Sequence, residues 1–373
     1  RLVKIDRGIK MNRQRKKTFL TLLSTTVAAG VLAVAITWSL LVADFQGSRG
    51  CNNYGTAISS VQKLVPGSCT IFTASRGNTV LFGNNEDYKF DNTFYWVRLP
   101  GKGTYGGVYL GHRSEEDIRS RGLDGIAPQG GVNEKGLAYD YAVLPKAPLT
   151  PHPELPGMGH IMMKIQQSCA TVEEAITMAK KHDWGSALGW QALLADATGD
   201  AVVISAGKDG ELAFTRKPHH DTYLVATNFN RANPKNADAP RIYVWLKLLF
   251  SSYPCQRYEK SVELLEKIDS EKDLTVSYFQ SILDAVHIEG ASGNTEYSNV
   301  IDLKNGVIYL NHWHQYDETA TINVAKEIAK HSSSAHLVGK IAKQPSPIRI
   351  KDLFSPETVL RAEKEHQEYK KNK

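Results

Sequence analysis

Cys69 and the polar cluster that follows it are the residues of this chain best suited to chemistry. The run at 66–72 carries a cysteine and a threonine out of a turn of small residues onto an apolar strand, and a second strand brings Gly-Asn-Asn-Glu-Asp at 83–87 back beside it. A thiol is a good nucleophile only as a thiolate, so a catalytic cysteine needs a base and polar neighbours. Asp87, Asn84 and Asn85 are the candidate neighbours. The alternative is a buried cysteine that serves only packing, beside asparagines that form a turn.

Positive charge is concentrated at the start of the chain. Residues 1–17 hold eight basic residues and one acidic residue, a net charge of +7, whereas the whole chain carries +6. The rest of the chain is therefore close to neutral and offers no basic face for nucleic acid. We expect no nucleic-acid partner.

The segment at 18–43 is free of charged residues and rich in Leu, Val, Ala, Ile and Thr. About 20 apolar residues cross a bilayer, and the preceding positive charge predicts a cytoplasmic N-terminal leader at 1–17. A cleaved signal peptide has an apolar core of only about 7–15 residues, which favours an uncleaved anchor, although cleavage after Ala43 stays open. Either way we expect the remainder to lie outside the cytoplasm, with 44–68 as a linker or propeptide.

The four cysteines do not follow a metal-binding pattern. Their spacing matches no zinc motif, and an oxidising compartment leaves open a disulfide from Cys51 to Cys169 or Cys255. The chain also lacks a Walker loop, a nucleophile elbow and a His-Glu-x-x-His motif, and its Gly-x-Gly-x-x-Gly run at 101–106 leads into a β-rich run rather than the helix of a dinucleotide fingerprint. We therefore expect no cofactor.

Two histidine pairs are candidate metal ligands. His219 adjoins His220, and His312 and His314 alternate on an expected strand. Neither pair has a carboxylate or cysteine set converging on it in the sequence, and such histidines are usually ordinary. The expectation is that the chain has no metal site.

Short β-rich runs separated by glycines and asparagines alternate with blocks of helical periodicity. Blocks of this kind favour antiparallel sheets layered with helices, an α+β fold, over a parallel doubly wound sheet. We assign 69–343 to the catalytic domain and 344–373 to a peripheral charged tail. Helices are expected at 158–181, with Thr171 as an N-cap within it, and at 241–251, 257–269 and 273–287.

The ordered set of motifs resembles a known family. Ser-Cys-Thr at 68–70, Phe-Gly-Asn-Asn-Glu-Asp at 82–87, Gly-Val-Asn-Glu-Lys-Gly-Leu-Ala at 131–138, Asp-Ala-Thr-Gly-Asp-Ala-Val-Val at 196–203 and Ala-Thr-Asn-Phe at 226–229 carry the resemblance. The family is that of the linear-amide hydrolases with an N-terminal cysteine, which includes choloylglycine hydrolases, penicillin V acylases and acyl-coenzyme A:6-aminopenicillanate acyltransferases. The resemblance covers about 69–311. It implies a four-layer αββα sandwich in which Cys69 becomes the first residue of the mature chain.

The resemblance also implies a mechanism and its residues. A freed α-amino group, with a pKa of about 7.7–8.0, would be the base for the thiol of the same residue. Asp87 would hold that amino group, Asn228 would donate an amide N–H to the oxyanion hole, and Arg241 would lower the thiol pKa or hold Asp87.

The chain departs from the family pattern at two places. Asn84 stands where the bile-salt and penicillin acylases carry arginine, and this is closer to the acyltransferase-like branch. Val143 falls where those acylases place Tyr or Asn, so only its main-chain N–H could serve the oxyanion hole. Asn84, Asn85 and Val143 are therefore expected in supporting roles.

Our prediction is an extracytoplasmic cysteine amidohydrolase that cuts a linear carbon–nitrogen amide of a small N-acyl substrate through a thioester, after self-cleavage before Cys69. Two alternatives stay open: acyl transfer to an amine by the same thioester, and a membrane-tethered binding module whose site has decayed. The sequence also leaves open whether identical chains assemble into an oligomer.

Overall fold

The computed structural model describes residues 68–88, 92–121, 128–218, 220–230, 232, 254–289, 293–336 and 345–371. The leader at 1–17, the apolar segment at 18–43, all but the last residue of 44–68, Arg241 and the helix expected at 241–251 lie outside this range. Among the described residues, no helix has both the length and the apolar character that a bilayer crossing needs.

The first of two antiparallel sheets contains Cys69. Its strand order is β10-β1-β2-β11-β12-β13. The bounds are β1 Ser68–Arg76, β2 Thr79–Tyr88, β10 Tyr223–Ala226, β11 Asn294–Asp302, β12 Val307–His312 and β13 Ala320–Asn323. β2 is buried on both faces over eight consecutive residues, because another layer covers each face of the sheet.

The second sheet runs in the order β14-β3-β4-β5-β6-β7-β8-β9, and every pairing in it is antiparallel. Its strands are β3 Thr93–Arg98, β4 Gly107–His112, β5 Gly130–Asn133, β6 Ala138–Pro148, β7 Ala187–Ala195, β8 Ala201–Ala206, β9 Leu212–Arg216 and β14 Ile348–Arg349. The Asn-Glu-Lys-Gly segment at 133–136 connects β5 to β6.

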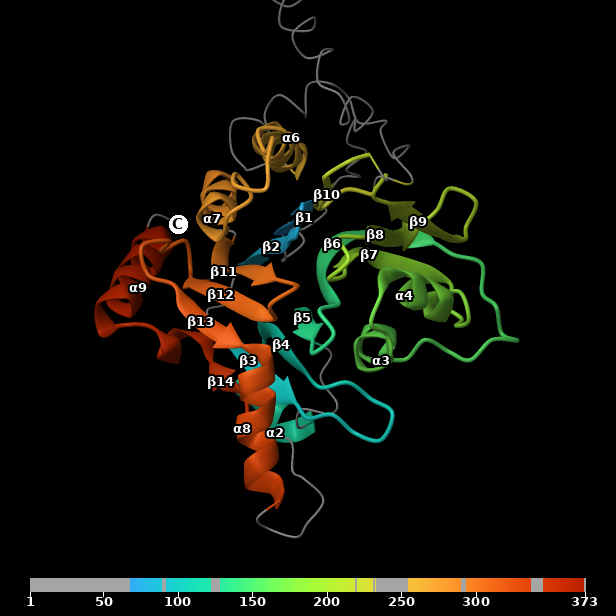
Figure 1. Cartoon of the computed structure of the whole chain (residues 1–373), viewed down its shortest axis with the longest axis horizontal. Coiled ribbons are helices and arrows are strands. Elements are labelled where there is room, and N and C mark those ends of the chain that lie inside the picture. The colour runs from blue at the N-terminus through green and yellow to red at the C-terminus, as the bar shows by residue number, and fades with distance from the viewer. Residues whose placement is uncertain are drawn as a thin grey trace, which may run out of the picture. The chain divides into compact units, whose positions relative to one another are not determined.

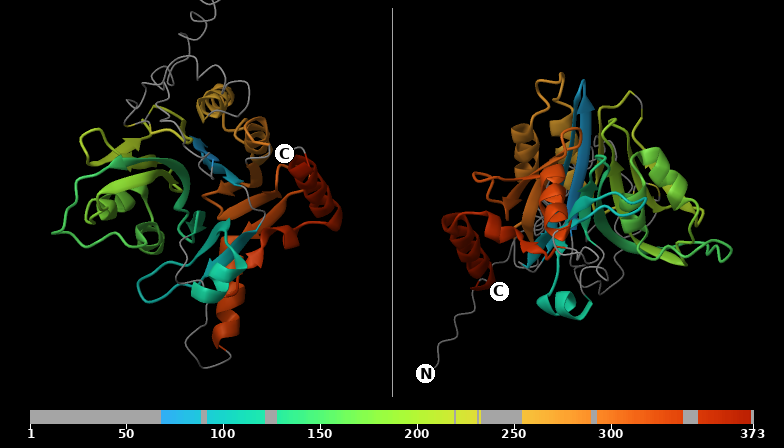
Figure 2. Two further views of the ribbon diagram at one scale, coloured as in Figure 1. Left: turned by 180° about the vertical axis from the view of Figure 1, so that it is seen from behind. Right: turned by 60° about the horizontal axis from the view of Figure 1, so that its bottom comes forward.

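Helices cover the outer faces of both sheets. α6 (Pro254–Leu265) packs on β1 and β10, and α7 (Val276–Ala285) packs on β2 and β11. α3 (Ile161–Ser168) and α4 (Val172–Ala179) join one hydrophobic core with the outer face of the second sheet, while a separate core fills the space between the sheets. These layers are visible in Figures 1 and 2. The expected fold class of antiparallel sheets with helices is confirmed.

The helix expected at 158–181 is in fact two helices, α3 and α4, interrupted after Ser168. The second helix begins where Thr171 predicts it, because the Thr171 hydroxyl accepts a hydrogen bond from the main-chain N–H of Glu174. Cys169, in the break, is buried and forms no disulfide with any described residue.

The C-terminal residues belong to the body of the fold, which differs from the expected peripheral tail. β14 extends the second sheet beside β3, the 3₁₀ helix Ile350–Leu353 follows, and α9 (Pro356–Lys371) contacts β12. Ile350 and Phe354 join the core between the sheets. In the sequence, the high charge of this segment obscured the few apolar residues that anchor it to the core. α2 (Glu115–Arg121) and α8 (Val324–His336) complete the described helices.

Replacing Ile350, whose side chain is 0% exposed, with alanine should lower the free energy of unfolding by about 2–5 kcal/mol in denaturant titrations. Leu360→Ala is the matched control on α9, where the side chain is 52% exposed, and should change it by about 0.5 kcal/mol or less. Equal small effects would show that 345–371 is peripheral after all.

Candidate active site

Cys69 lies at the start of β1, between β10 and β2, with its side chain only 3% exposed. Side chains alternate between the two faces of a strand. Cys69 and its cross-strand partner Glu86 therefore point toward the second sheet, whereas Thr70 and Asp87 point toward α6 and α7. The two faces of β1 and β2 thus carry different parts of the site.

Asp87 lies on the helix-facing side and is held from two directions. Arg257 of α6 places Nη1 at 3.3 Å from Asp87 Oδ2 and at 2.5 Å from the Thr70 hydroxyl. The hydroxyl of Thr295 on β11 donates to Asp87 Oδ1 at 2.5 Å. Burial raises the pKa of Asp87 to about 7, while Arg257 and the Thr295 hydrogen bond act to lower it.

Asn228 connects the ion pair of Asp87 and Arg257 to Cys69 through hydrogen bonds. Its Oδ1 accepts hydrogen bonds from the main-chain N–H of Cys69 at 2.8 Å and from Arg257 Nη2 at 2.9 Å. Its Nδ2 donates to the main-chain carbonyl of Val143 at 3.0 Å. Asn228, just after β10, therefore connects Arg257 of α6 and Val143 of β6 to the main-chain nitrogen of Cys69.

The predicted site residues fall into distinct places. Cys69, Asp87 and Asn228 come together, and Val143 joins them through its carbonyl rather than the expected N–H. Arg241 lies outside the described residues. The contact with Asp87 that was expected of Arg241 is made by Arg257.

The two asparagines of the motif differ sharply. Asn85 faces α7, where its Nδ2 donates to the Leu283 carbonyl at 2.8 Å and its Oδ1 accepts from Ser298 at 2.6 Å. Asn85 therefore anchors a helix to the sheet. Asn84 points toward the second sheet with a fully buried side chain, and neither its amide oxygen nor its nitrogen has a hydrogen-bond partner. Its cross-strand neighbour Asn299 is buried with the same two atoms unpaired.

Glu86 and Asp140 are polar residues of the site that the sequence reasoning missed. Glu86 Oε2 lies 3.7 Å from Cys69 Sγ, and its Oε1 lies 3.3 Å from Nδ1 of His112. Asp140 on β6 is 1% exposed, and a side chain on Gly130 would collide with it, since a Cβ there would lie 2.2 Å from Asp140 Oδ2.

These carboxylates affect the thiol directly. Burial raises the pKa of the Cys69 thiol well above its ordinary value, and Glu86, Asp140 and Asp87 raise it further. A hydrogen bond with the main chain of Asp87 acts in the opposite direction. With the chain continuous through Ser68 and Cys69, the site therefore keeps the sulfur protonated.

The sequence held weak signals for the missed residues. Side chains alternate between the two faces of a strand, so the sequence alone places Glu86 and Asp87 on opposite faces. Which of the two shares a face with Cys69 then depends on the strand register. Arg257 lies three residues after Pro254, whereas Arg241 directly follows Pro240, and each begins a block of expected helical periodicity, so the sequence offered two arginine candidates. Thr295 and Asp140 carried no local signal.

The fold is shared with solved structures, although neither a protein-family model nor a curated protein matches the sequence. Two variants of conjugated bile acid hydrolase from Clostridium perfringens each superpose with a TM-score of 0.53 at 15% identity. Each match covers 75% of this chain, and 96% and 98% of the respective hydrolase chains. Penicillin V acylase from Agrobacterium tumefaciens matches at 19% identity over 65% of this chain and 83% of its own, with a TM-score of 0.48.

These likenesses concern the fold. The chain has the layered αββα sandwich fold that its motifs predict, and it shares this fold with conjugated bile acid hydrolase at low sequence identity.

Replacing Glu86 with glutamine should lower the pKa of the Cys69 thiol, because it removes the nearest negative charge at almost constant size. The pH at which alkylation of Cys69 by iodoacetamide reaches half its maximal rate should fall, as followed by peptide mass spectrometry. Cys169, whose thiol pKa burial raises to about 11, gives an internal reference. The exposed Glu116→Gln is the control, and an equal shift in both variants would contradict the account.

Proposed function

We propose that this chain is a cysteine-nucleophile amidohydrolase that cuts a linear carbon–nitrogen amide of an N-acyl substrate, after cleavage of its own Ser68–Cys69 bond. The observation that carries the proposal is the hydrogen bond from the main-chain nitrogen of Cys69 to Asn228, with Arg257 and Asp87 behind it. A site that uses only the thiol needs no hydrogen bond to the nitrogen of the same residue, whereas a site that uses this nitrogen as a base must hold it in place.

The proposed reaction proceeds through a thioester. Cleavage frees the α-amino group of Cys69, which takes the thiol proton, and the thiolate adds to the substrate carbonyl. The resulting oxyanion receives an N–H of Asn228. Collapse breaks the carbon–nitrogen bond as the α-ammonium returns the proton to the departing amine. Water then hydrolyses the thioester to a carboxylic acid and restores the thiol.

Asp87 and Arg257 have separate roles in this scheme. The carboxylate of Asp87 binds the α-amino group, and Arg257 favours the ionised form of that carboxylate against the effect of burial. Arg257 also donates a hydrogen bond to the side-chain oxygen of Asn228. This fixes the orientation of the amide, so that its N–H donors point away from the guanidinium.

The acidic surroundings of the sulfur favour particular substrates. Glu86 would face any group bound beside the thiol, and a carboxylate there would meet its negative charge in a buried site. We therefore propose that the leaving amine carries a neutral or cationic group next to the scissile bond. A screen of N-acyl amides tests this: acyl-ethanolamides and acyl-homoserine lactones should be hydrolysed faster than glycine-conjugated bile acids and penicillin V, and the reverse order would contradict it.

The location of the enzyme is part of the proposal. The charge pattern of 1–43 supports an extracytoplasmic catalytic domain. Cleavage before Cys69 would release that domain from an N-terminal anchor, unless Cys51 forms a disulfide with Cys169 or Cys255.

A decayed binding module is the second candidate, favoured by the burial and raised pKa of the Cys69 thiol and by the unpaired Asn84 amide. Rapid, selective alkylation of Cys69 in protein purified from cells supports the enzyme. Labelling no faster than at Cys169 supports the module.

Replacing Cys69 with serine should lower the hydrolysis rate by at least about 100-fold, because a hydroxyl is far harder to ionise than a thiol. Far-ultraviolet circular dichroism should remain unchanged. Intact mass of the wild-type enzyme quenched during turnover should show one acyl group, mapped to Cys69. An acyl adduct elsewhere, or undiminished hydrolysis by the serine variant, would refute the assignment.

The acid limb of the hydrolysis rate should lie near pH 7, where Asp87, with a pKa of about 7, becomes protonated and loses its hold on the α-amino group. Arg257→Gln removes the cation that lowers this pKa, so the limb should move to higher pH. Arg216→Gln, which breaks a surface ion pair with Asp200 and Glu173, is the matched control. An acid limb that stays in place in Arg257→Gln would contradict the role of Asp87.

A further inference from the structure

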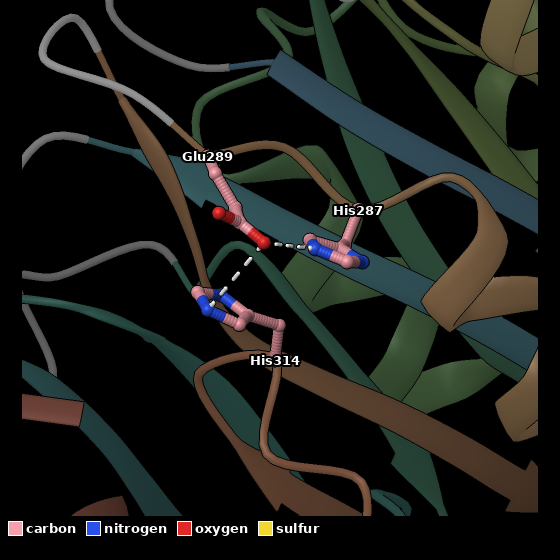
Figure 3. A group of neighbouring side chains, drawn as sticks. All are labelled: His287, Glu289 and His314. Atoms are coloured by element: carbon pink, nitrogen blue, oxygen red, sulfur yellow. Dashed lines mark hydrogen bonds and ion pairs between the residues drawn. The ribbon is translucent and has the colours of Figure 1, made fainter. Parts of the chain in front are cut away.

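A second cluster of functional side chains lies where the connection from α7 to β11 meets the turn after β12. His287 and Glu289 come from the connection and His314 from the turn. One ligand atom of each lies within 4.8 Å of those of the other two. Figure 3 shows one Glu289 oxygen facing a ring nitrogen of each histidine.

A fourth donor reaches the same place from the C-terminal helix. Oε2 of Glu365 on α9 lies 2.9 Å from His314 Nε2, which is also 3.9 Å from Glu289 Oε1. The two imidazole rings stack with centroids 4.8 Å apart. Two imidazoles and one carboxylate therefore converge, and a second carboxylate from a third segment lies beside His314.

The hydrogen-bond roles leave a place for a cation. Nδ1 of His287 contacts the main-chain carbonyl of Asp284, which can only accept, so Nδ1 carries the hydrogen. Nε2 of the neutral ring is then a lone pair, yet it lies 2.8 Å from the Glu289 carboxylate, which also only accepts. A proton or a metal ion must lie between these acceptors. A carbonyl that fixes one ring nitrogen is the usual support for a histidine that binds metal through the other.

We propose that His287, His314 and Glu289, with Glu365 as a fourth ligand, form a site for Zn²⁺ or a similar first-row divalent metal. Two histidines and a carboxylate form a known zinc ligand set, and imidazole nitrogen disfavours Mg²⁺ and Ca²⁺. Zinc bonds of about 2.0–2.2 Å place tetrahedral ligand atoms roughly 3.4 Å apart, so the cluster needs only a small contraction. Glu289 Oε1 already lies 2.8 Å from His287 Nε2 and 3.9 Å from His314 Nε2, so the contraction falls mainly between the two imidazoles.

The site would connect the C-terminal helix to the catalytic carboxylate. Ile288, between two of the ligands, donates its N–H to the Thr295 hydroxyl at 3.0 Å and accepts from the Thr295 N–H at 3.0 Å. That same hydroxyl donates to Asp87. A bound metal would thus fasten α9 to the segment that orients Asp87, which makes it a structural support beside the active site.

Binding is tested on the full chain, stripped with a chelator and titrated with Zn²⁺ or Co²⁺ alone. We expect one equivalent to bind, an increase in Tm, and visible Co²⁺ absorption typical of four-coordinate geometry. His314→Gln and His287→Gln should each weaken Zn²⁺ affinity by at least about 100-fold, more than the 10–100-fold typical for loss of a supporting residue. Circular dichroism checks that each variant folds.

Two controls separate this site from other zinc-binding groups. His152 also contacts two carboxylates, Glu154 and Glu211, but on the surface, so His152→Gln should leave the affinity unchanged. Cys69→Ser should also leave it unchanged, since the thiol is not a ligand. The proposal is overturned if Zn²⁺ does not bind, if Mg²⁺ or Ca²⁺ binds instead, or if the His287 and His314 variants bind as tightly as the wild type. None of these readouts depends on hydrolysis.

Discussion

The hydrogen bond between the main-chain nitrogen of Cys69 and Asn228 is the constraint around which the site is organised. It joins residues 159 positions apart, and it requires β1 to pair with β10 at the point where α6 delivers Arg257. Asn228 also donates a hydrogen bond to the main-chain carbonyl of Val143 in the second sheet. One amide therefore ties two sheets and a helix to the first atoms of the nucleophilic residue.

Charge balance at this point suggests how cleavage and reactivity are connected. While the chain is continuous, burial and three nearby carboxylates keep the pKa of the Cys69 thiol high. Release of the α-amino group would add a cation beside Glu86 and Asp87, offsetting the same carboxylates that suppress the thiolate. The carboxylates that suppress thiol ionisation in the uncleaved chain would then stabilise the pair formed by the α-ammonium and the thiolate. On this account, cleavage supplies both the base and the charge that lets the thiol ionise.

The local motifs predicted most of the framework, because turns, caps and strand alternation depend on neighbouring residues. Cys69, Asp87 and the Thr171 cap were found in this way, whereas Asn228 came from the resemblance to the linear-amide hydrolases. Arg257, Thr295 and the partners of His314 were not, since each meets its counterpart only through sheet register and helix packing over long sequence separations. The C-terminal segment was misjudged for a related reason: a few apolar residues in a charged stretch suffice to anchor it.

The most direct test of the central claim is to identify the residue that precedes the reactive sulfur in active enzyme. Protein purified from cells is labelled with a thiol-directed probe until hydrolysis stops, and the labelled peptide is sequenced by mass spectrometry. The account predicts a peptide that begins at labelled Cys69 with a free α-amino group. A fully active enzyme whose labelled Cys69 is still joined to Ser68 would contradict it.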